Sequence, residues 1–254
     1  MRTDVSDHAP RLSIVIPAYN EERRLPGTLE RLHAYLSQQP YAWEIIVVSN
    51  ASTDATEDVV HEASNGVANL HLICINERGK GIAVKKGALQ SRGDFVFLCD
   101  ADMSMPPTQI ETFFEAAVTT DIVIGSREAP GSVRMGEPSH RHLMGRVFNR
   151  LVQWLAVGGL NDTQCGFKLI RREAAQRLCT MQTVNGFGFD VELLYLARKL
   201  GYSVHEVPVE WHFDHDTRVR PGVDTVTMVV EVLMIRLRDL MGQYDYRQRV
   251  PANK

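Results

Sequence analysis

Two aspartates separated by a single residue, Ala101, give the clearest chemical signal in the sequence. Asp100 and Asp102 directly follow the apolar run "FVFLC", and Ser104 lies just beyond them. Two carboxylates this close repel each other when they lose water, so a positive charge is expected between them. Carboxylate oxygens suit Mg²⁺ or Mn²⁺, and Mg²⁺ is commonly held by one or two carboxylates together with phosphate oxygens. The pair therefore predicts a divalent-metal site, with Asp102 and Asp100 as its protein ligands.

The elements expected around this pair alternate between strands and helices. Short runs rich in Ile, Val and Phe predict strands at 12–16, 44–48, 71–75, 94–99 and 121–125. Apolar residues at helical spacing predict helices at 21–38, 54–63, 80–91 and 107–119, and further helices at 140–157, 172–180 and 223–241. Strands that are hydrophobic throughout indicate a mostly parallel sheet with both faces covered, so the expected fold class is α/β with a doubly wound sheet.

Polar motifs follow each of these strands. They read "PAYNE", "SNASTD", "NERGKG", "DADMS" and "GSR". Ligands of doubly wound sheets bind at the carboxyl ends of the strands, so these five loops are expected to converge on one site.

The overall composition narrows the class of protein. The chain has 254 residues, is 44% hydrophobic and 23% charged, and carries a formal net charge of −3. These values are ordinary for a soluble α/β domain and offer no electrostatic case for binding nucleic acid. Four scattered cysteines predict free thiols in a reducing compartment. No run reaches the ~18–20 apolar residues of a membrane-spanning helix, and no signal-peptide core is seen, so we expect a cytoplasmic protein.

Taken together, these motifs resemble family 2 glycosyltransferases of the GT-A fold. The similarity extends from "IVIPAYNEE" and "STDAT" through "GKGIAVKKGALQSRGDFVFLCDADMS" to "GSR". "DTQCGFKLIRREAA", "FDVELLYLARKLGY" and "EVPVEW" look like the polyprenyl-phosphate sugar transferases, closest to the dolichyl-phosphate glucosyltransferase type. The resemblance implies a GT-A domain at 11–222, preceded by a flexible segment at 1–10 and followed by an amphipathic helix and tail at 223–254. It also permits dimers or higher assemblies.

The resemblance implies an inverting, metal-dependent transfer of a hexose to a polyprenyl phosphate. UDP-glucose is the favoured donor and GDP-mannose the alternative. The implied donor-binding residues are Pro17, Tyr19, Glu21, Ser49, Asn50, Lys80, Asp100, Ala101, Asp102, Ser104, Arg127 and Arg218. Within the "GKG" turn, backbone N–H groups as well as Lys80 are expected to face phosphate or the neighbouring sugar.

Two further acids, Asp190 and Asp162, compete for the centre of the reaction. Asp190 matches the position where inverting enzymes of this fold keep a general base, which a hydroxyl acceptor needs. A lipid phosphate, with a second pKa near ~6, is already largely anionic at neutral pH and needs orientation instead. The sequence leaves open which of the two acids is essential.

The sequence departs from the family pattern in two ways. "VVSNASTD" stands where the family usually has "VVDDGSTD", so Ser49, Asn50 and Ala51 replace two acids and a glycine. This change suggests one alternative, a protein that binds nucleotide sugars without turnover. The membrane helices of many relatives are also missing, which favours the other alternative, transfer to a soluble hydroxyl acceptor. The basic, aromatic segment at 132–157 and the helix at 223–241 are either core helices or surfaces for peripheral membrane contact at the inner face.

Overall fold

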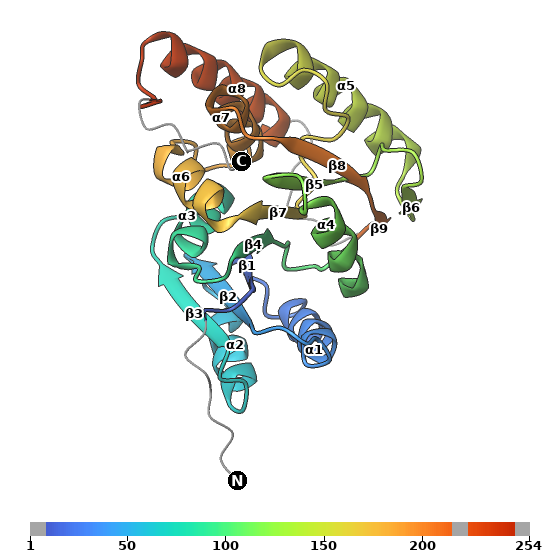
Figure 1. The fold of residues 1–254 in the computed structure, drawn as a ribbon, viewed down its shortest axis with the longest axis vertical. Helices are drawn as coiled ribbons and strands as arrows, with labels where there is room; N and C mark the ends of the chain where they lie inside the picture. The colour runs from blue at the N-terminus through green and yellow to red at the C-terminus, as the bar shows by residue number, and fades with distance from the viewer. Residues whose placement is uncertain (1–8, 215–222, 247–254) are drawn as a thin grey trace.

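The computed structural model describes residues 9–214 and 223–246, and Figure 1 shows their arrangement. The first half contains β1 (Leu12–Ala18), α1 (Leu25–Leu36), β2 (Trp43–Asn50), α2 (Thr56–Ser64), β3 (Leu70–Ile75), α3 (Lys80–Gln90), β4 (Phe95–Leu98), a 3₁₀ turn (Pro107–Gln109), α4 (Ile110–Ala116) and β5 (Ile122–Ser126). The second half contains β6 (Val133–Met135), α5 (Ser139–Leu155), β7 (Lys168–Arg171), α6 (Arg172–Met181), α7 (Phe189–Leu200), β8 (Val204–Pro208), β9 (Glu210–His212) and α8 (Val223–Leu240). The α/β fold class is confirmed, and the predicted elements appear with ends shifted by a few residues.

The central sheet has the strand order β3-β2-β1-β4-β7-β5-β8. All neighbouring strands are parallel except β7, which runs antiparallel to both β4 and β5. Its first residue, Lys168, is paired with Leu98 of β4 and Ile124 of β5. Because β7 runs in the opposite sense, it begins at the edge where β4 and β5 end. The segment before it, 162–167, therefore joins the polar loops at the carboxyl edge.

Hydrophobic layers cover both faces of the sheet. Ile14 and Ile16 of β1 pack on one face with α1, α2 and α4, whereas Val15 packs on the other with α3, α6 and α7. Side chains of a strand alternate between faces, so a strand that is apolar throughout supplies both layers. This is the physical reason why the continuous apolar runs predicted the architecture.

Three loops at the carboxyl edge hold non-glycine residues in the left-handed region. Asn20, Ala51 and Met103, which follow β1, β2 and β4, have φ angles of 55°, 58° and 45°. This conformation is unfavourable for an L-residue with a Cβ atom. Contacts between the loops hold it, since Oδ1 of Asn20 accepts a hydrogen bond of 2.8 Å from the amide of Thr53.

The last helix, α8, packs beside α5 and α7, and Figure 1 shows α5 and α8 side by side at the top of the molecule. Met228, Val232 and Ile235 of α8 are buried in the core. The predicted division of the chain at residue 222 stays a prediction, and most of the N-terminal segment 1–10 lies outside the described residues. Among the described helices, none has the length and apolar character needed to cross a bilayer.

Candidate active site

A cleft of about 1060 Å³ opens at the carboxyl edge of the sheet. The residues predicted to bind donor or act in catalysis that line it are Pro17, Tyr19, Glu21, Asn50, Lys80, Asp100, Ala101, Asp102, Ser104, Arg127 and Asp190. Two predicted residues, Ser49 and Asp162, do not line it. A third, Arg218, lies outside the described residues.

The aspartate pair at the end of β4 meets a lysine from the first turn of α3. Nζ of Lys80 lies 2.6 Å from Oδ1 of Asp100. Burial alone would raise the pKa of Asp100, but the positive charge of Lys80 lowers it below its ordinary value. Burial and the adjacent charge of Asp100 raise the pKa of Asp102 instead. The two carboxylates thus have different environments despite their spacing.

Asp102 is the carboxylate that fits a metal. In the part of the chain that the structure describes, no side-chain cation forms an ion pair with it, and its Oδ1 accepts a hydrogen bond of 3.2 Å from the amide of Ser104. No cluster of three or more His, Cys, Asp or Glu side chains suited to a metal occurs among those residues. Mg²⁺ needs only one or two carboxylates when substrate phosphates complete its shell. The donor set therefore fits a metal that is bound jointly with a diphosphate.

The start of α3 differs from the prediction. Backbone N–H groups of Gly81 and Ile82 donate to the carbonyl oxygen of Asn185, at 2.8 and 3.3 Å. A Cβ atom at Gly79 would lie 2.3 Å from that same oxygen. The expectation that the amides of this turn face phosphate was therefore wrong for Gly81, because the loop before α7 packs directly on it. Gly79 and Lys80 both line the cleft.

One end of the cleft is built by the loops after β1, β2 and β3. The guanidinium of Arg78 lies 4.3 Å from the centre of the Tyr19 ring, a cation–π contact that the sequence did not predict. Asn50 lines the cleft beside them. The carboxylate of Glu21 accepts hydrogen bonds from Arg24, including one of 2.6 Å from Nε. Glu21 is thus already paired within the protein.

Ser49 does not lie where the sequence predicted. It is fully buried, and its Oγ donates a hydrogen bond of 2.8 Å to Glu57 on α2. Successive side chains of a strand point to opposite faces, so only one of two neighbouring residues can face the cleft. Asn50 is the residue that faces the cleft. The alternation of side-chain direction along β2 was the sequence signal that could have distinguished Asn50 from Ser49.

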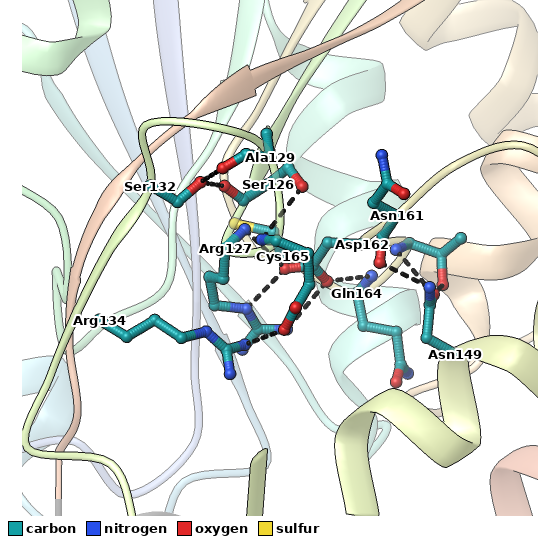
Figure 2. Close-up of polar contacts among 12 residues, drawn as sticks. Ser126, Arg127, Ala129, Ser132, Arg134, Asn149, Asn161, Asp162, Gln164 and Cys165 are labelled. Atoms are coloured by element: carbon teal, nitrogen blue, oxygen red, sulfur yellow. Dashed lines mark hydrogen bonds and ion pairs between the residues drawn. The ribbon is translucent and has the colours of Figure 1, made fainter. Parts of the chain in front are cut away.

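Arg127 and Asp162 form one unit (Figure 2). Oδ2 of Asp162 accepts hydrogen bonds from the backbone N and Nε of Arg127, at 3.0 and 2.7 Å, and Oδ1 accepts one of 3.0 Å from Nη2. Although burial alone would raise it, the Arg127 charge lowers the pKa of Asp162 to about 2. The Arg127 guanidinium also lies 5.2 Å from the centre of the Trp211 ring. Asp162 therefore does not line the cleft but binds Arg127 and orients it. This corrects the prediction that Asp162 itself acts in the cleft.

Asp190 lies in the first turn of α7 and is paired with a lysine from β7. Oδ1 of Asp190 accepts a hydrogen bond of 2.5 Å from Nζ of Lys168. Both side chains are almost completely buried. Lys168 was missed by the sequence reasoning, and the available signal was a lysine inside the otherwise apolar run "CGFKLI".

The other end of the cleft is more apolar and lies between α5 and α8. Phe148 and Met144 of α5 line it, together with Phe187 of the loop before α7 and Met228 of α8. Arg141 of α5 also lines the cleft, with its guanidinium 5.0 Å from the centre of the Phe213 ring. The cleft thus joins a charged half rich in Asp, Lys and Arg to a half suited to an apolar group.

Comparison with known proteins agrees with this geometry. The model of glycosyl transferase family 2 matches residues 13–179. Dolichyl-phosphate beta-glucosyltransferase of Dictyostelium discoideum is 34% identical over 91% of this chain and 75% of its own length. The protein of the same name from Homo sapiens is 33% identical over 96% of this chain and 80% of its own length.

A solved structure extends the comparison to the fold. Glucosyl-3-phosphoglycerate synthase from Mycobacterium tuberculosis, in complex with Mn²⁺, UDP-glucose and phosphoglyceric acid, superimposes with a TM-score of 0.66 and 20% identity. The match covers 92% of this chain and 80% of that chain, and it shows a shared GT-A fold. The chain belongs to glycosyl transferase family 2 and, within it, is similar to the dolichyl-phosphate beta-glucosyltransferases.

Proposed function

We propose that this protein transfers glucose from UDP-glucose to a polyprenyl phosphate of the dolichyl type, with inversion at the anomeric carbon. The observation that carries the proposal is the two-part cleft. Its charged half, with Lys80, Asp102 and Arg127, suits a nucleotide diphosphate, and its apolar half suits a lipid. The names of the curated relatives, which match nearly the whole chain, support the same donor sugar and acceptor.

The donor diphosphate would lie between Asp102 and Arg127. Asp102, next to Asp100, is the residue that would hold Mg²⁺ or Mn²⁺, and the Mn²⁺ in the related solved structure supports this assignment. When bound, such an ion offsets the charge that develops on the leaving nucleoside diphosphate. Arg127 contributes a fixed positive charge, because Asp162 holds its guanidinium in place.

The acceptor needs little activation. A phosphate monoester has a second pKa near ~6, so its oxygen is already anionic at neutral pH. The role proposed for Asp190 is then to accept hydrogen bonds from the sugar or to orient the acceptor. The comparisons lend no support to mannose as the sugar, to a soluble hydroxyl acceptor or to a role without turnover.

The test is transfer by the purified protein from radiolabelled UDP-glucose to dolichyl phosphate in detergent, with Mn²⁺, with Mg²⁺ and with a chelator. We expect a β-linked lipid-phosphate glucose that forms only with metal. Asp102→Asn is expected to lose turnover while its melting temperature stays close to that of the wild type. Asp58→Asn, which changes an exposed carboxylate on α2, is the matched control. An active Asp102→Asn variant, or a wild type that transfers no glucose, would contradict the proposal.

The lipid acceptor would reach the cleft from a bilayer lying against α5 and α8. Leu143, Val147 and Trp154 form an exposed stripe on α5, and Trp154 is 82% exposed. A second exposed stripe on α8 consists of Val226, Val230, Leu233, Leu237 and Leu240. The α5 helix contains no acidic residue and exposes Arg146 and Arg150, which suits an anionic lipid surface.

Vesicle sedimentation measures this contact. The protein is expected to bind vesicles that contain phosphatidylglycerol more tightly than neutral ones, and Trp154→Ser combined with Leu237→Ser is expected to abolish binding. Val118→Ser, at an exposed apolar residue beyond α4, is the control. Concentration-dependent dimers that dissociate in the double variant, without vesicle binding, would assign the surface to a second copy instead.

A further inference from the structure

Lys168 is a charged residue at the centre of the sheet. Its side chain is 1% exposed, and its strand β7 lies between β4 and β5. A buried ammonium is costly unless it is paired and hydrogen-bonded. Nζ of Lys168 donates to the carbonyl oxygen of Cys165 and to Oδ1 of Asp190. The side chain is therefore held from two sides and directed toward the floor of the cleft.

Asp190 is the partner that reaches the cleft. It is 4% exposed, and the charged groups that act on it come from three elements: Lys168 of β7, Lys80 of α3 and Asp100 after β4. Burial raises the pKa of Asp190, while the two lysines oppose that rise. Lys80 already has a partner at 2.6 Å in Asp100. Lys168 is thus the cation in direct contact with Asp190.

We propose that Lys168 is a positioning residue for the transfer, which keeps the Asp190 carboxylate ionised and in one orientation at the floor of the cleft. An ionised Asp190 accepts hydrogen bonds from sugar hydroxyl groups, whereas a protonated one loses part of that capacity. The inference rests on the proposed function only for the role of Asp190 in transfer. The charge state itself can be measured without substrate.

A purely structural ion pair elsewhere in the protein supplies the comparison. Glu44 is 2% exposed and pairs with Arg92, at 2.8 Å from Oε2 to Nη2, at the opposite end of the sheet strands from the cleft. Removal of the cation from either pair leaves a buried carboxylate without its ion pair, although Glu44 keeps hydrogen bonds from Ser13 and from the amide of residue 92. Arg92→Met is therefore the matched control for Lys168→Met, since both destabilise the fold but only one faces Asp190.

The first experiment is a ¹³C NMR titration of the Asp190 carboxyl carbon, identified by its absence in Asp190→Asn. In Lys168→Met, we expect the midpoint to rise by about 1–3 pH units relative to the wild type. Arg92→Met is expected to leave it unchanged, and Lys168→Arg to restore most of the wild-type value. Lys168→Gln, which keeps a donor toward Cys165, replaces Lys168→Met if the latter does not fold. A titration midpoint of Asp190 that is unchanged in Lys168→Met, or in Lys168→Gln where that variant replaces it, would overturn the proposal.

The second experiment measures glucose transfer against pH. In Lys168→Met, kcat is expected to fall at neutral pH and to recover as the pH rises, with little change in the KM for UDP-glucose. A loss of kcat that is equal at every pH would indicate a structural role and overturn the proposal. If the wild type transfers no glucose, the proposed function fails, but the NMR titration still decides the role of Lys168.

Discussion

Gly166→Ala is a perturbation that moves one carboxylate without changing any charge. Gly166 lies in the segment before β7 and lines the cleft. A Cβ atom there would lie 2.2 Å from Oδ2 and 2.6 Å from Cγ of Asp100. The φ angle of Gly166 is not positive, so alanine fits the backbone and only the contact with Asp100 is at stake.

The expected size of the effect follows from the distance. Ordinary contact begins at 3.4 Å, so the Asp100 carboxylate must move by about 1.2 Å from its present 2.2 Å separation. Directed away from Lys80, that movement loses the short 2.6 Å hydrogen bond between Nζ of Lys80 and Oδ1 of Asp100 and weakens the ion pair. A misplacement of ~1 Å in an active site can cost on the order of 100-fold in rate, or about 2.7 kcal/mol of transition-state stabilisation. We therefore expect kcat/KM for UDP-glucose to fall by about two orders of magnitude.

Gly145→Ala is the matched control. Gly145 also lines the cleft, but its Cβ would meet nothing within 4 Å, and alanine inside a helix gains about 0.5–1 kcal/mol of stability. Transfer rates, Mn²⁺-dependent UDP binding by calorimetry and thermal melting are measured for both variants. The reasoning is refuted if Gly166→Ala keeps wild-type kcat/KM and UDP affinity, because the position of Asp100 would then be unimportant.

Two predictions concern stability. Although burial opposes it, Arg127 lowers the pKa of Asp162 from 3.8 to about 2, so the ionised form stabilises the fold above pH ~4 and this stabilisation is lost as the pH falls toward 2. Asp162→Asn is expected to lose about 2 kcal/mol at pH 7 in urea unfolding, and a gap to the wild type that does not narrow by pH 2 would contradict this. Ala51, with a φ of 58°, holds a conformation that glycine adopts freely, so Ala51→Gly is expected to raise the free energy of unfolding by about 0.5–1 kcal/mol. Thermal melting checks it, with a lowered melting temperature as the opposing result.

The sequence predicted the charged half of the cleft because that half depends on topology alone. Every parallel strand of a doubly wound sheet ends at the same edge, so the residues just after the strands must gather there. Asp100, Asp102 and Arg127 follow strands, Asn50 ends β2 and Lys80 begins α3, and all five line the cleft. Their positions at this edge can be predicted without knowing which distant segments are in contact.

The rest depends on how segments far apart in the sequence pack. Insertion of β7 between β4 and β5 places Asp162 behind Arg127 and Lys168 beneath Asp190. In the loop before α7, the carbonyl oxygen of Asn185 accepts hydrogen bonds from backbone amides in the first turn of α3. These contacts join residues that are at least 22 positions apart in the sequence, so no local periodicity indicates them. Local patterns therefore indicate which residues reach the edge of the sheet, but not which partner each one meets there.

The charges beneath the cleft explain why a metal is expected at Asp102 in particular. Three cations are each paired with one aspartate: Lys80 with Asp100, Lys168 with Asp190 and Arg127 with Asp162. Each of these ion pairs has no net charge, although Lys80 and Arg127 still line the cleft. Asp102 has no such partner among the described residues, and burial together with the adjacent charge of Asp100 raises its pKa. A bound diphosphate would add further negative charge beside it, and a divalent ion held by Asp102 would balance both.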